Sequence, residues 1–269
     1  MRQFVSDSNP DKEGLITVSG KDYRYFKQVL RLVPGDMLAV RIPLGELVDT
    51  TVAKIDESKK NVVLQLCDSQ SSDKTRTGGK NQSSFLNEVE FYLFQFAAKG
   101  SKMDLIVRQA AECGVTKIIP VLGEFTQAGS AEKNFRSDRY ERIIKEARQQ
   151  SGSPVATSIE KTVDVDGAIK LWKDISEGKD NCFCCVLYER SEKTKGLHEA
   201  LSEYKDVKKC AIICGAEGGI SPGEIEKFAG EGIVPVHFDT NILRCETAAL
   251  YGMACVQSAV SEKSVWQQR

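Results

Sequence analysis

The sequence has little net charge, no long apolar run and only two histidines, and each shortage excludes a class of protein. Among 269 residues, 38 Asp and Glu nearly balance 37 Lys and Arg, so no overall field draws the chain toward nucleic acid or membrane. No apolar run reaches the length of about 18 residues that spans a bilayer, and no charged-then-apolar leader opens the chain. We therefore expect a soluble, cytoplasmic protein whose charge acts only in local patches.

The scarcity of histidine also bears on the nine cysteines. An odd number of cysteines without an export leader predicts reduced thiols rather than a disulfide framework. Cys182 and Cys185 form one C-x-x-C, but a second well-spaced pair is missing, and the only histidines are His198 and His237. Because the cysteines lie in apolar strand candidates, we interpret them as small core residues and predict no metal site.

Hydrophobic residues are absent from the tract 69–84. Such a tract cannot repay the entropy of ordering, so we predict an exposed polar linker over 71–84. The linker divides the chain into a domain at 1–70 and a domain at 85–269. A hydrophobic content of 41% is ample for packed cores, and the length suits two domains.

The apolar patterns differ on the two sides of this linker. A helix near 21–32 and β runs at 37–42, 48–55 and 62–66 indicate a small β-rich module. After the linker, strands alternate with amphipathic helices, which is typical of βα units around a mainly parallel sheet. We expect strands near 89–96, 116–121, 183–188, 210–214 and 233–237, and helices near 102–113, 136–150, 164–174, 222–229 and 244–260.

The most informative segment is Gly215-Ala216-Glu217-Gly218-Gly219-Ile220-Ser221, which follows a strand candidate. Its glycines leave bare backbone that a flat ligand can approach closely. The segment is neither a P-loop, because no G-K-[ST] closes it, nor a G-x-G-x-x-G fingerprint. An ordinary strand-to-helix turn is the alternative, since Ser221 and Pro222 are a helix start signal. A second segment, Asn241-Ile242-Leu243-Arg244-Cys245-Glu246-Thr247-Ala248, favours ligand contact.

Together these segments resemble the signatures G-P-E-G-G-[FIL]-[ST] and [RN]-I-L-R-x-E-T-A of the ribosomal RNA small subunit methyltransferase E family, in the SPOUT class of RNA methyltransferases. Further blocks of the family follow in the expected order: Val29–Leu32 with Pro34–Asp36, Lys102–Leu105, Ala111–Val115 and Glu146–Gly152. The chain departs from the pattern at Ala216, Asp239, Asn241 and Ser153. The resemblance covers nearly the whole chain.

The resemblance implies an α/β fold with a trefoil-knotted, mainly parallel sheet and helices on both faces, preceded by a small PUA-like β-barrel. It implies S-adenosylmethionine-dependent methylation of uridine N3 in small-subunit (16S) ribosomal RNA, by a homodimer that acts on the small ribosomal subunit. The residues implied to hold the cofactor are Leu187, Gly215, Ala216, Glu217, Gly218, Gly219, Ile220, Ile242, Leu243, Arg244, Glu246, Thr247 and Ala248. Glu217 and Glu246 have an alternative role in fixing loop geometry.

Basic residues recur at every third position from Lys133 to Arg148. A step of three falls about 60° short of a helical turn, so these charges wrap the helix. One interpretation is a solvated face with pairs such as Asp138–Arg142; the other is phosphate contact. The predicted RNA-binding residues are Arg2, Arg24, Lys27, Arg31, Arg136, Arg139 and Arg142, and those of the amino-terminal module lie near Tyr23, Tyr25 and Phe26.

Methylation at uridine N3 requires a base or a group that stabilises the anion formed when the imide proton leaves. No side chain stands out as the base, and Arg139 or Arg142 is the candidate for stabilising the anion. Three alternatives remain open at this point. The chain is a non-catalytic RNA-binding or ribosome-assembly protein on the same fold, a SPOUT methyltransferase with a different RNA target, or a nucleotide-binding protein that uses the Ser221 helix start for phosphate.

Overall fold

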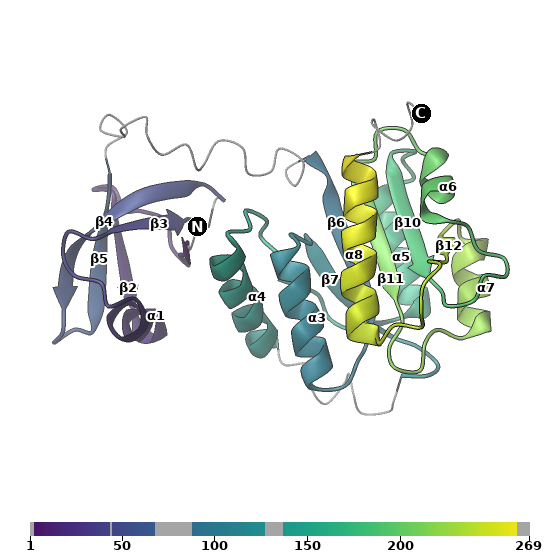
Figure 1. The fold of residues 1–269 in the computed structure, drawn as a ribbon. Helices are drawn as coiled ribbons and strands as arrows, with labels where there is room; N and C mark the ends of the chain where they lie inside the picture. Colours follow the sequence, from purple (N-terminus) through teal and green to yellow (C-terminus); the bar gives the residue numbers. More distant parts are fainter. Residues whose placement is uncertain (1–2, 44, 68–87, 127–136, 263–269) are drawn as a thin grey trace. The chain divides into compact units, whose positions relative to one another are not determined.

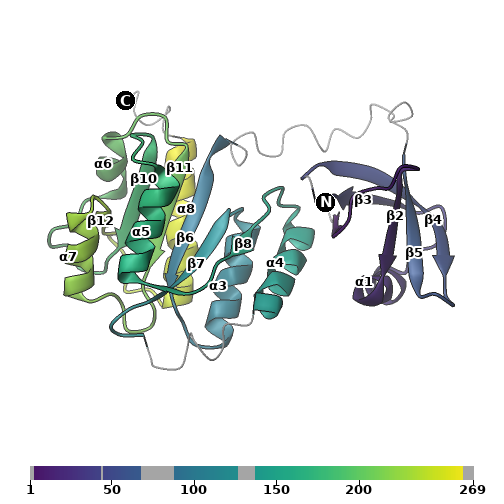
Figure 2. The same ribbon diagram turned by 180° about the vertical axis from the view of Figure 1, so that it is seen from behind.

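The computed structural model describes residues 3–43, 45–67, 88–126 and 137–262. The predicted linker, Arg2 and Arg136 lie outside these residues. The chain forms two compact units, one of residues 1–82 with 148–154 and the other of residues 83–147 with 155–269. Figure 1 and Figure 2 show the elements of each unit from two sides.

The amino-terminal unit is built on a five-stranded sheet in the order β1-β3-β4-β5-β2. Its strands are β1 (Phe4–Val5), β2 (Leu15–Ser19), β3 (Met37–Arg41), β4 (Leu47–Asp56) and β5 (Asn61–Leu66). The pair β1–β3 is parallel and the other pairs are antiparallel. This sheet is consistent with the small barrel that the family resemblance implies.

The helix predicted near 21–32 consists of α1 (Gly20–Arg24) and a π-helical turn, η1 (Tyr25–Leu30). Phe26 is fully buried and meets Phe4 edge to face at 4.7 Å between ring centroids. Phe26 is thus a core residue, whereas Tyr23 and Tyr25 pack only partly against the core. The sequence prediction missed strands β1 and β2. β1 is only two residues long, and the alternation of apolar and polar residues in β2 extends over only five.

The carboxy-terminal unit is a wholly parallel sheet in the order β12-β10-β11-β6-β7-β8, with β9 also paired to β7. The strands are β6 (Glu90–Phe96), β7 (Lys117–Leu122), β8 (Ser158–Ile159), β9 (Val163–Asp164), β10 (Cys182–Leu187), β11 (Lys209–Cys214) and β12 (Val234–Val236). Central strands such as β6 and β10 are buried along nearly their whole length, as expected for a sheet covered on both faces.

Helices cover both faces of this sheet (Figure 1, Figure 2). One face packs against α3 (Ser101–Glu112), α4 (Ser137–Ser151), α6 (Leu197–Ser202) and α8 (Cys245–Ser261), and the other against α5 (Val165–Ser176) and α7 (Pro222–Gly230). The predicted α/β architecture is confirmed. The short elements α6, β8 and β9 were missed, because none is long enough to show a periodicity. The trefoil knot stays a prediction.

Candidate functional site

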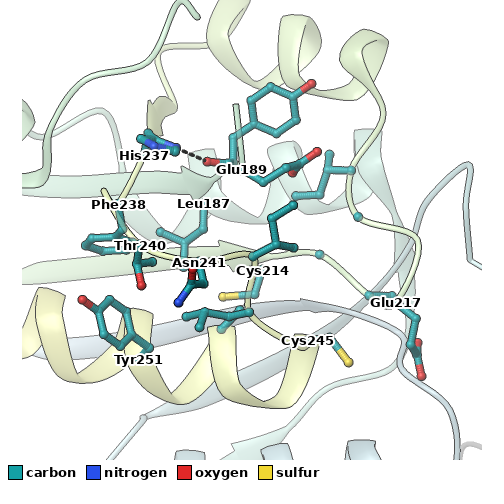
Figure 3. A pocket seen from close by; sticks show the side chains of 18 of the residues that line it. Leu187, Glu189, Cys214, Glu217, His237, Phe238, Thr240, Asn241, Cys245 and Tyr251 are labelled. Atoms are coloured by element: carbon teal, nitrogen blue, oxygen red, sulfur yellow. Dashed lines mark hydrogen bonds between the residues drawn. The ribbon is translucent and has the colours of Figure 1, made fainter. Parts of the chain in front are cut away.

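A cavity of about 310 Å³ opens where β10 and β11 end and α8 begins, a volume at the lower end of the range for ligand sites. Figure 3 shows side chains from three separate parts of the carboxy-terminal unit around it. The lining residues are Leu187, Tyr188, Glu189, Cys214, Gly215, Ala216, Glu217, Gly218, Gly219, Ile220, His237, Phe238, Thr240, Asn241, Ile242, Leu243, Cys245, Ala248 and Tyr251. The glycine-rich loop and the segment before α8 therefore form one site.

The glycine-rich loop is a tight turn stabilised by its own backbone. The amide of Gly219 donates to the carbonyl of Ala216 at 3.0 Å, and Gly219 has a φ of +75°. A Cβ at Gly215 would lie 3.1 Å from backbone atoms of Gly219, and one at Gly218 would lie 2.7 Å from Cβ of Phe125. Gly215 and Gly218 thus allow close packing, and Gly219 allows the left-handed backbone of the turn. The same compactness leaves the backbone of the loop facing the cavity.

Gln95, near the end of β6, fastens this loop to the sheet. Its fully buried side chain donates through Nε2 to the carbonyl of Gly215 at 3.1 Å and to that of Phe96 at 2.9 Å. A buried amide bonded in this way is costly to remove, because its partners lose their hydrogen bonds inside the protein. The sequence prediction missed Gln95, although it is the only polar residue within the apolar run 91–96.

The segment before α8 is held at both ends. His237 donates its backbone amide to the carbonyl of Lys195 at 3.1 Å, and its Nδ1 lies 3.2 Å from the carbonyl of Tyr188. Because a carbonyl only accepts, this contact places the ring proton on Nδ1. Phe238 meets Tyr251 of α8 edge to face at 5.3 Å. The turn is therefore fixed to β10 on one side and to α8 on the other.

The contact between α8 and β10 depends on a glycine inside the helix. A Cβ added at Gly252 would lie 2.4 Å from Cδ1 of Leu187, far inside ordinary van der Waals contact. Leu187 is the last residue of β10 and lines the cavity. Because Gly252 has no side chain, the Leu187 side chain can pack against α8, and this contact sets the position of Leu187 in the cavity wall.

Charged groups gather where the glycine-rich loop meets the first turns of α3 and α8. Oε1 of Glu217 lies 3.1 Å from Nζ of Lys102 and accepts from the backbone amide of Lys99 at 3.2 Å. Burial alone would raise the pKa of Glu217, but hydrogen bonds from its own amide, Lys102 and Lys99 lower it. Burial, followed by a hydrogen bond to Glu246, raises the pKa of the Cys245 thiol to about 12. The carboxylate is therefore ionised and the thiol neutral near pH 7.

The structure brings most of the predicted cofactor residues to the cavity wall and leaves Arg244, Glu246 and Thr247 off it. Arg244 and Thr247 are exposed at the start of α8. A hydrogen bond from its own amide, then one from the Cys245 thiol, lowers the pKa of Glu246. The lining residues that the sequence prediction omitted are Tyr188, Glu189, Cys214, His237, Phe238, Thr240, Asn241, Cys245 and Tyr251. Most of these residues lie within or next to one of the two motifs, so extending each motif by a few positions could have found them. Glu189 lies outside both motifs, and no pattern in the sequence points to it.

The predicted RNA-binding and catalytic arginines lie in different settings. Arg139, in the first turn of α4, is paired with Asp104 of α3, whereas Arg142 is exposed. In the amino-terminal unit, Arg24 and Arg31 are exposed, and Arg31 has a φ of +54°, which is uncommon for a residue other than glycine.

The other predicted RNA-binding residues are Lys27, Arg2 and Arg136. Lys27 lies 3.0 Å from Glu57, and Arg2 and Arg136 fall outside the described residues. Of the predicted arginines that the structure describes, none lines the cavity.

The helix start at Ser221 is occupied by its own side chains. Oγ of Ser221 accepts from the amide of Glu224 at 3.3 Å, and the carboxylate of Glu224 accepts from the amide of Ser221 at 2.8 Å. Glu224 is buried and also accepts from the amide of Glu124 at 2.7 Å. This capping box places a carboxylate where a phosphate would bind, and so disfavours the nucleotide-binding alternative.

The cysteines of β10 and β11 are packed as small apolar side chains. Cys184, Cys185, Cys210 and Cys214 are buried, and burial raises the pKa of each thiol. Within the described residues, no group of three His, Cys, Asp or Glu side chains is placed to hold a metal ion. No helix among them is both long and apolar enough to cross a bilayer.

Comparisons with known proteins agree with this geometry. The family model of the RNA methyltransferase domain matches residues 86–257. Ribosomal RNA small subunit methyltransferase E 2 of Borreliella burgdorferi is 26% identical over 97% of this chain and 99% of its own. Its counterpart in Aquifex aeolicus is 30% identical over 55% of this chain and 59% of its own.

A solved structure shows the same fold over both units. It is ribosomal RNA small subunit methyltransferase E from Neisseria gonorrhoeae bound to S-adenosyl methionine, with a TM-score of 0.74, 20% identity, and coverage of 96% of this chain and 97% of that one. The chain therefore belongs to the RNA methyltransferase domain family, as its resemblance to the SPOUT-class ribosomal RNA small subunit methyltransferase E family predicted.

Proposed function

We propose that this chain is an S-adenosylmethionine-dependent methyltransferase that modifies N3 of a uridine in 16S ribosomal RNA. The observation that carries the proposal is the single cavity formed by the glycine-rich loop and the turn before α8. The relatives named above bear the name of a small-subunit ribosomal RNA methyltransferase, and one was solved with the methyl donor bound.

The walls of the cavity suit such a donor. Leu187, Ile220, Leu243 and Ala248 supply apolar surface for a flat adenine ring, and the glycine-rich loop supplies backbone groups that bind polar edges. When bound, S-adenosylmethionine supplies a methyl group on a positively charged sulfur. The ionised carboxylate of Glu217 on the cavity wall complements that charge.

Holding donor and base at attack distance supplies much of the rate enhancement in such a transfer. Uridine N3 lies on the base-pairing edge, so the target base must be unpaired or flipped out of its stack to reach the cavity. The chain contributes by fixing the donor between β10, β11 and α8. It also excludes water from the apolar wall around Leu187 and Leu243.

We further propose a division of labour along the chain: a PUA-like RNA-binding domain at 1–70, a linker at 71–84 and the methyltransferase domain at 85–269. The exposed side chains of Arg24 and Arg31 support RNA contact by the first domain. Arg142 is exposed on α4 and supplies a further cation for phosphate.

The exposed apolar side chains of α3 and α8 support a homodimer. Leu105, Leu250 and Tyr251 are partly exposed, and Ile242 is 86% exposed. The helices α3 and α8 are neighbours, since Nε2 of Gln257 donates to the carbonyl of Cys113 at 2.8 Å (Figure 1). Sedimentation equilibrium of the whole chain should give twice the mass of one chain, and a monomer at micromolar concentration would contradict this part of the proposal.

The catalytic proposal is tested in two steps. Calorimetry should show that S-adenosylhomocysteine binds one site per chain without RNA, and more tightly than ATP. Incubation with labelled S-adenosylmethionine and unmodified small ribosomal subunits, followed by nucleoside analysis, should yield 3-methyluridine. Donor binding without methylation of any RNA would favour a non-catalytic role, and methylation of another RNA or atom would contradict the substrate assignment alone.

A further inference from the structure

The first turn of α3 is attached to the glycine-rich loop. Gly100, which precedes α3, has a φ of +48° and supplies no side chain to cap the helix. Glu217 holds this end of α3 from outside the helix, because its carboxylate accepts from the amide of Lys99, just before the helix, and contacts the side-chain ammonium of Lys102 at 3.1 Å. The start of α3 is thereby positioned beside the cavity.

The ammonium of Lys102 lies 3.1 Å from the carboxylate of Glu217, a residue of the cavity wall. It contacts Glu217 and is close enough to Cys245 and Glu246 to interact with them electrostatically. Glu217 and Cys245 both line the cavity and lie at the same end of it, away from His237 and Phe238 (Figure 3). The Lys102 side chain is 38% exposed. The ammonium is therefore partly open to solvent beside the Glu217 end of the cavity.

The Lys102 ammonium has donors to spare. It carries three N–H groups, and the contact with Glu217 uses one of them. Arg139 is placed less favourably, because its partner, Asp104, does not line the cavity, whereas Glu217 does. Arg142 is one turn further along α4 and is not among the residues that line the cavity.

We propose that Lys102 donates a hydrogen bond to a carbonyl oxygen of the target uridine and stabilises the imide anion from which N3 attacks. The inference rests on the proposed function. A preorganised cation beside an oxygen that gains negative charge is among the most effective contributions to catalysis. Lys102 takes this role in place of Arg139 and Arg142, which remain candidates for phosphate contact.

The reaction balances without a further reactant. The N3 proton leaves to solvent, and the N3 electron pair forms the new bond to the methyl carbon. The bond from that carbon to sulfur breaks, and its electron pair stays on sulfur, which becomes a neutral thioether. Lys102 keeps its proton and its contact with Glu217 throughout.

The charges around Lys102 keep it protonated. The hydrogen bond to Glu217 raises the pKa of Lys102, burial opposes the increase, and the charges of Glu217 and Glu246 add to it. Arg244 is the neighbouring cation, since it acts on Glu246. Because the raised pKa keeps the ammonium protonated at neutral and mildly alkaline pH, a pH-dependent difference between wild type and a Lys102 variant does not arise from titration of Lys102 itself.

The test compares Lys102→Met and Lys102→Arg with the wild-type chain in single-turnover methylation of unmodified small ribosomal subunits. At pH 7, Lys102→Met should be slower by about 100-fold, the typical cost of removing one such donor. The deficit should shrink toward pH 9, because the imide then ionises without help. Lys102→Arg should recover most of the rate. Arg108→Met, an exposed position further along α3, is the matched control and should behave as wild type.

Affinity for S-adenosylhomocysteine separates this role from a merely structural one. Each Lys102 variant should bind it within about twofold of wild type. The proposal is overturned if Lys102→Met retains the wild-type rate, or if its deficit is the same at every pH and accompanied by weaker binding. A wild-type chain that neither binds the product nor methylates RNA would instead refute the proposed function.

Discussion

The replacement Gly252→Ala tests how the cofactor cavity is shaped. The new methyl group would lie 2.4 Å from Cδ1 of Leu187, against about 3.5–4.0 Å for carbon atoms in contact. Leu187 must therefore move by more than about 1 Å. Its side chain already lines the cavity, so we expect it to move into that space.

Two opposing terms set the effect on stability. Alanine inside a helix is favoured over glycine by about 0.5–1 kcal/mol, whereas overpacking costs about 1–3 kcal/mol. The free energy of unfolding should thus fall by about 0–2.5 kcal/mol. Affinity for S-adenosylhomocysteine should fall by about tenfold, which corresponds to about 1.4 kcal/mol. Urea titration measures the first quantity and calorimetry the second.

A double-mutant cycle isolates the cause of the lost affinity. In a Leu187→Ala background the clash is removed, so adding Gly252→Ala should cost no further affinity. Gly223→Ala is the matched control, since nothing lies within 4 Å of the position of its new methyl group. Gly252→Ala with wild-type affinity, or with an equal loss in both backgrounds, would refute the reasoning.

Three further predictions concern the cap, the glycine-rich loop and the RNA surface. Ser221→Ala should lower the free energy of unfolding by about 1 kcal/mol in urea titration by removing half of the capping box, and a change within error would contradict that role. Glu217→Gln should destabilise the chain near pH 7, and the deficit should vanish as the pH falls below 4.5: the pKa of Glu217 is lowered in the fold, so its stabilising effect is present above the ordinary pKa and is lost through the lowered one. A deficit that persists at pH 3 would show that charge is not the cause. Arg142→Ala should weaken RNA binding and reduce the salt slope by about 1 without altering S-adenosylhomocysteine affinity, and an unchanged slope in filter binding would exclude phosphate contact by this residue.

Sequence patterns predicted the layout of the carboxy-terminal unit well. The buried strands of a parallel sheet are continuous apolar runs, so β6, β10 and β11 are visible without coordinates. The glycine-rich loop could also be recognised from the sequence, because several glycines in one short turn indicate close packing, an unusual backbone conformation or ligand contact. The two motifs, about 20 residues apart, could be linked through the family resemblance, and the structure places both on one cavity.

Contacts between distant side chains could not be predicted in the same way. Gln95 and Gly215 are 120 positions apart, and neither residue indicates the other. Lys102 belongs to a family block, but only the structure shows that its ammonium reaches Glu217. Nothing in the sequence around Gly252 indicates that a side chain there would clash with Leu187. Such pairs depend on packing between elements, on which local periodicity carries no information.

The most direct test of this account is a crystal structure of the chain grown with S-adenosylhomocysteine. We expect the ligand between the glycine-rich loop and the turn before α8, in contact with backbone atoms of Gly215–Ile220 and with Leu243. A ligand bound elsewhere on the chain would contradict the claim that these two segments form the methyl-donor site. So would a crystal grown at saturating ligand concentration in which protein side chains fill the cavity.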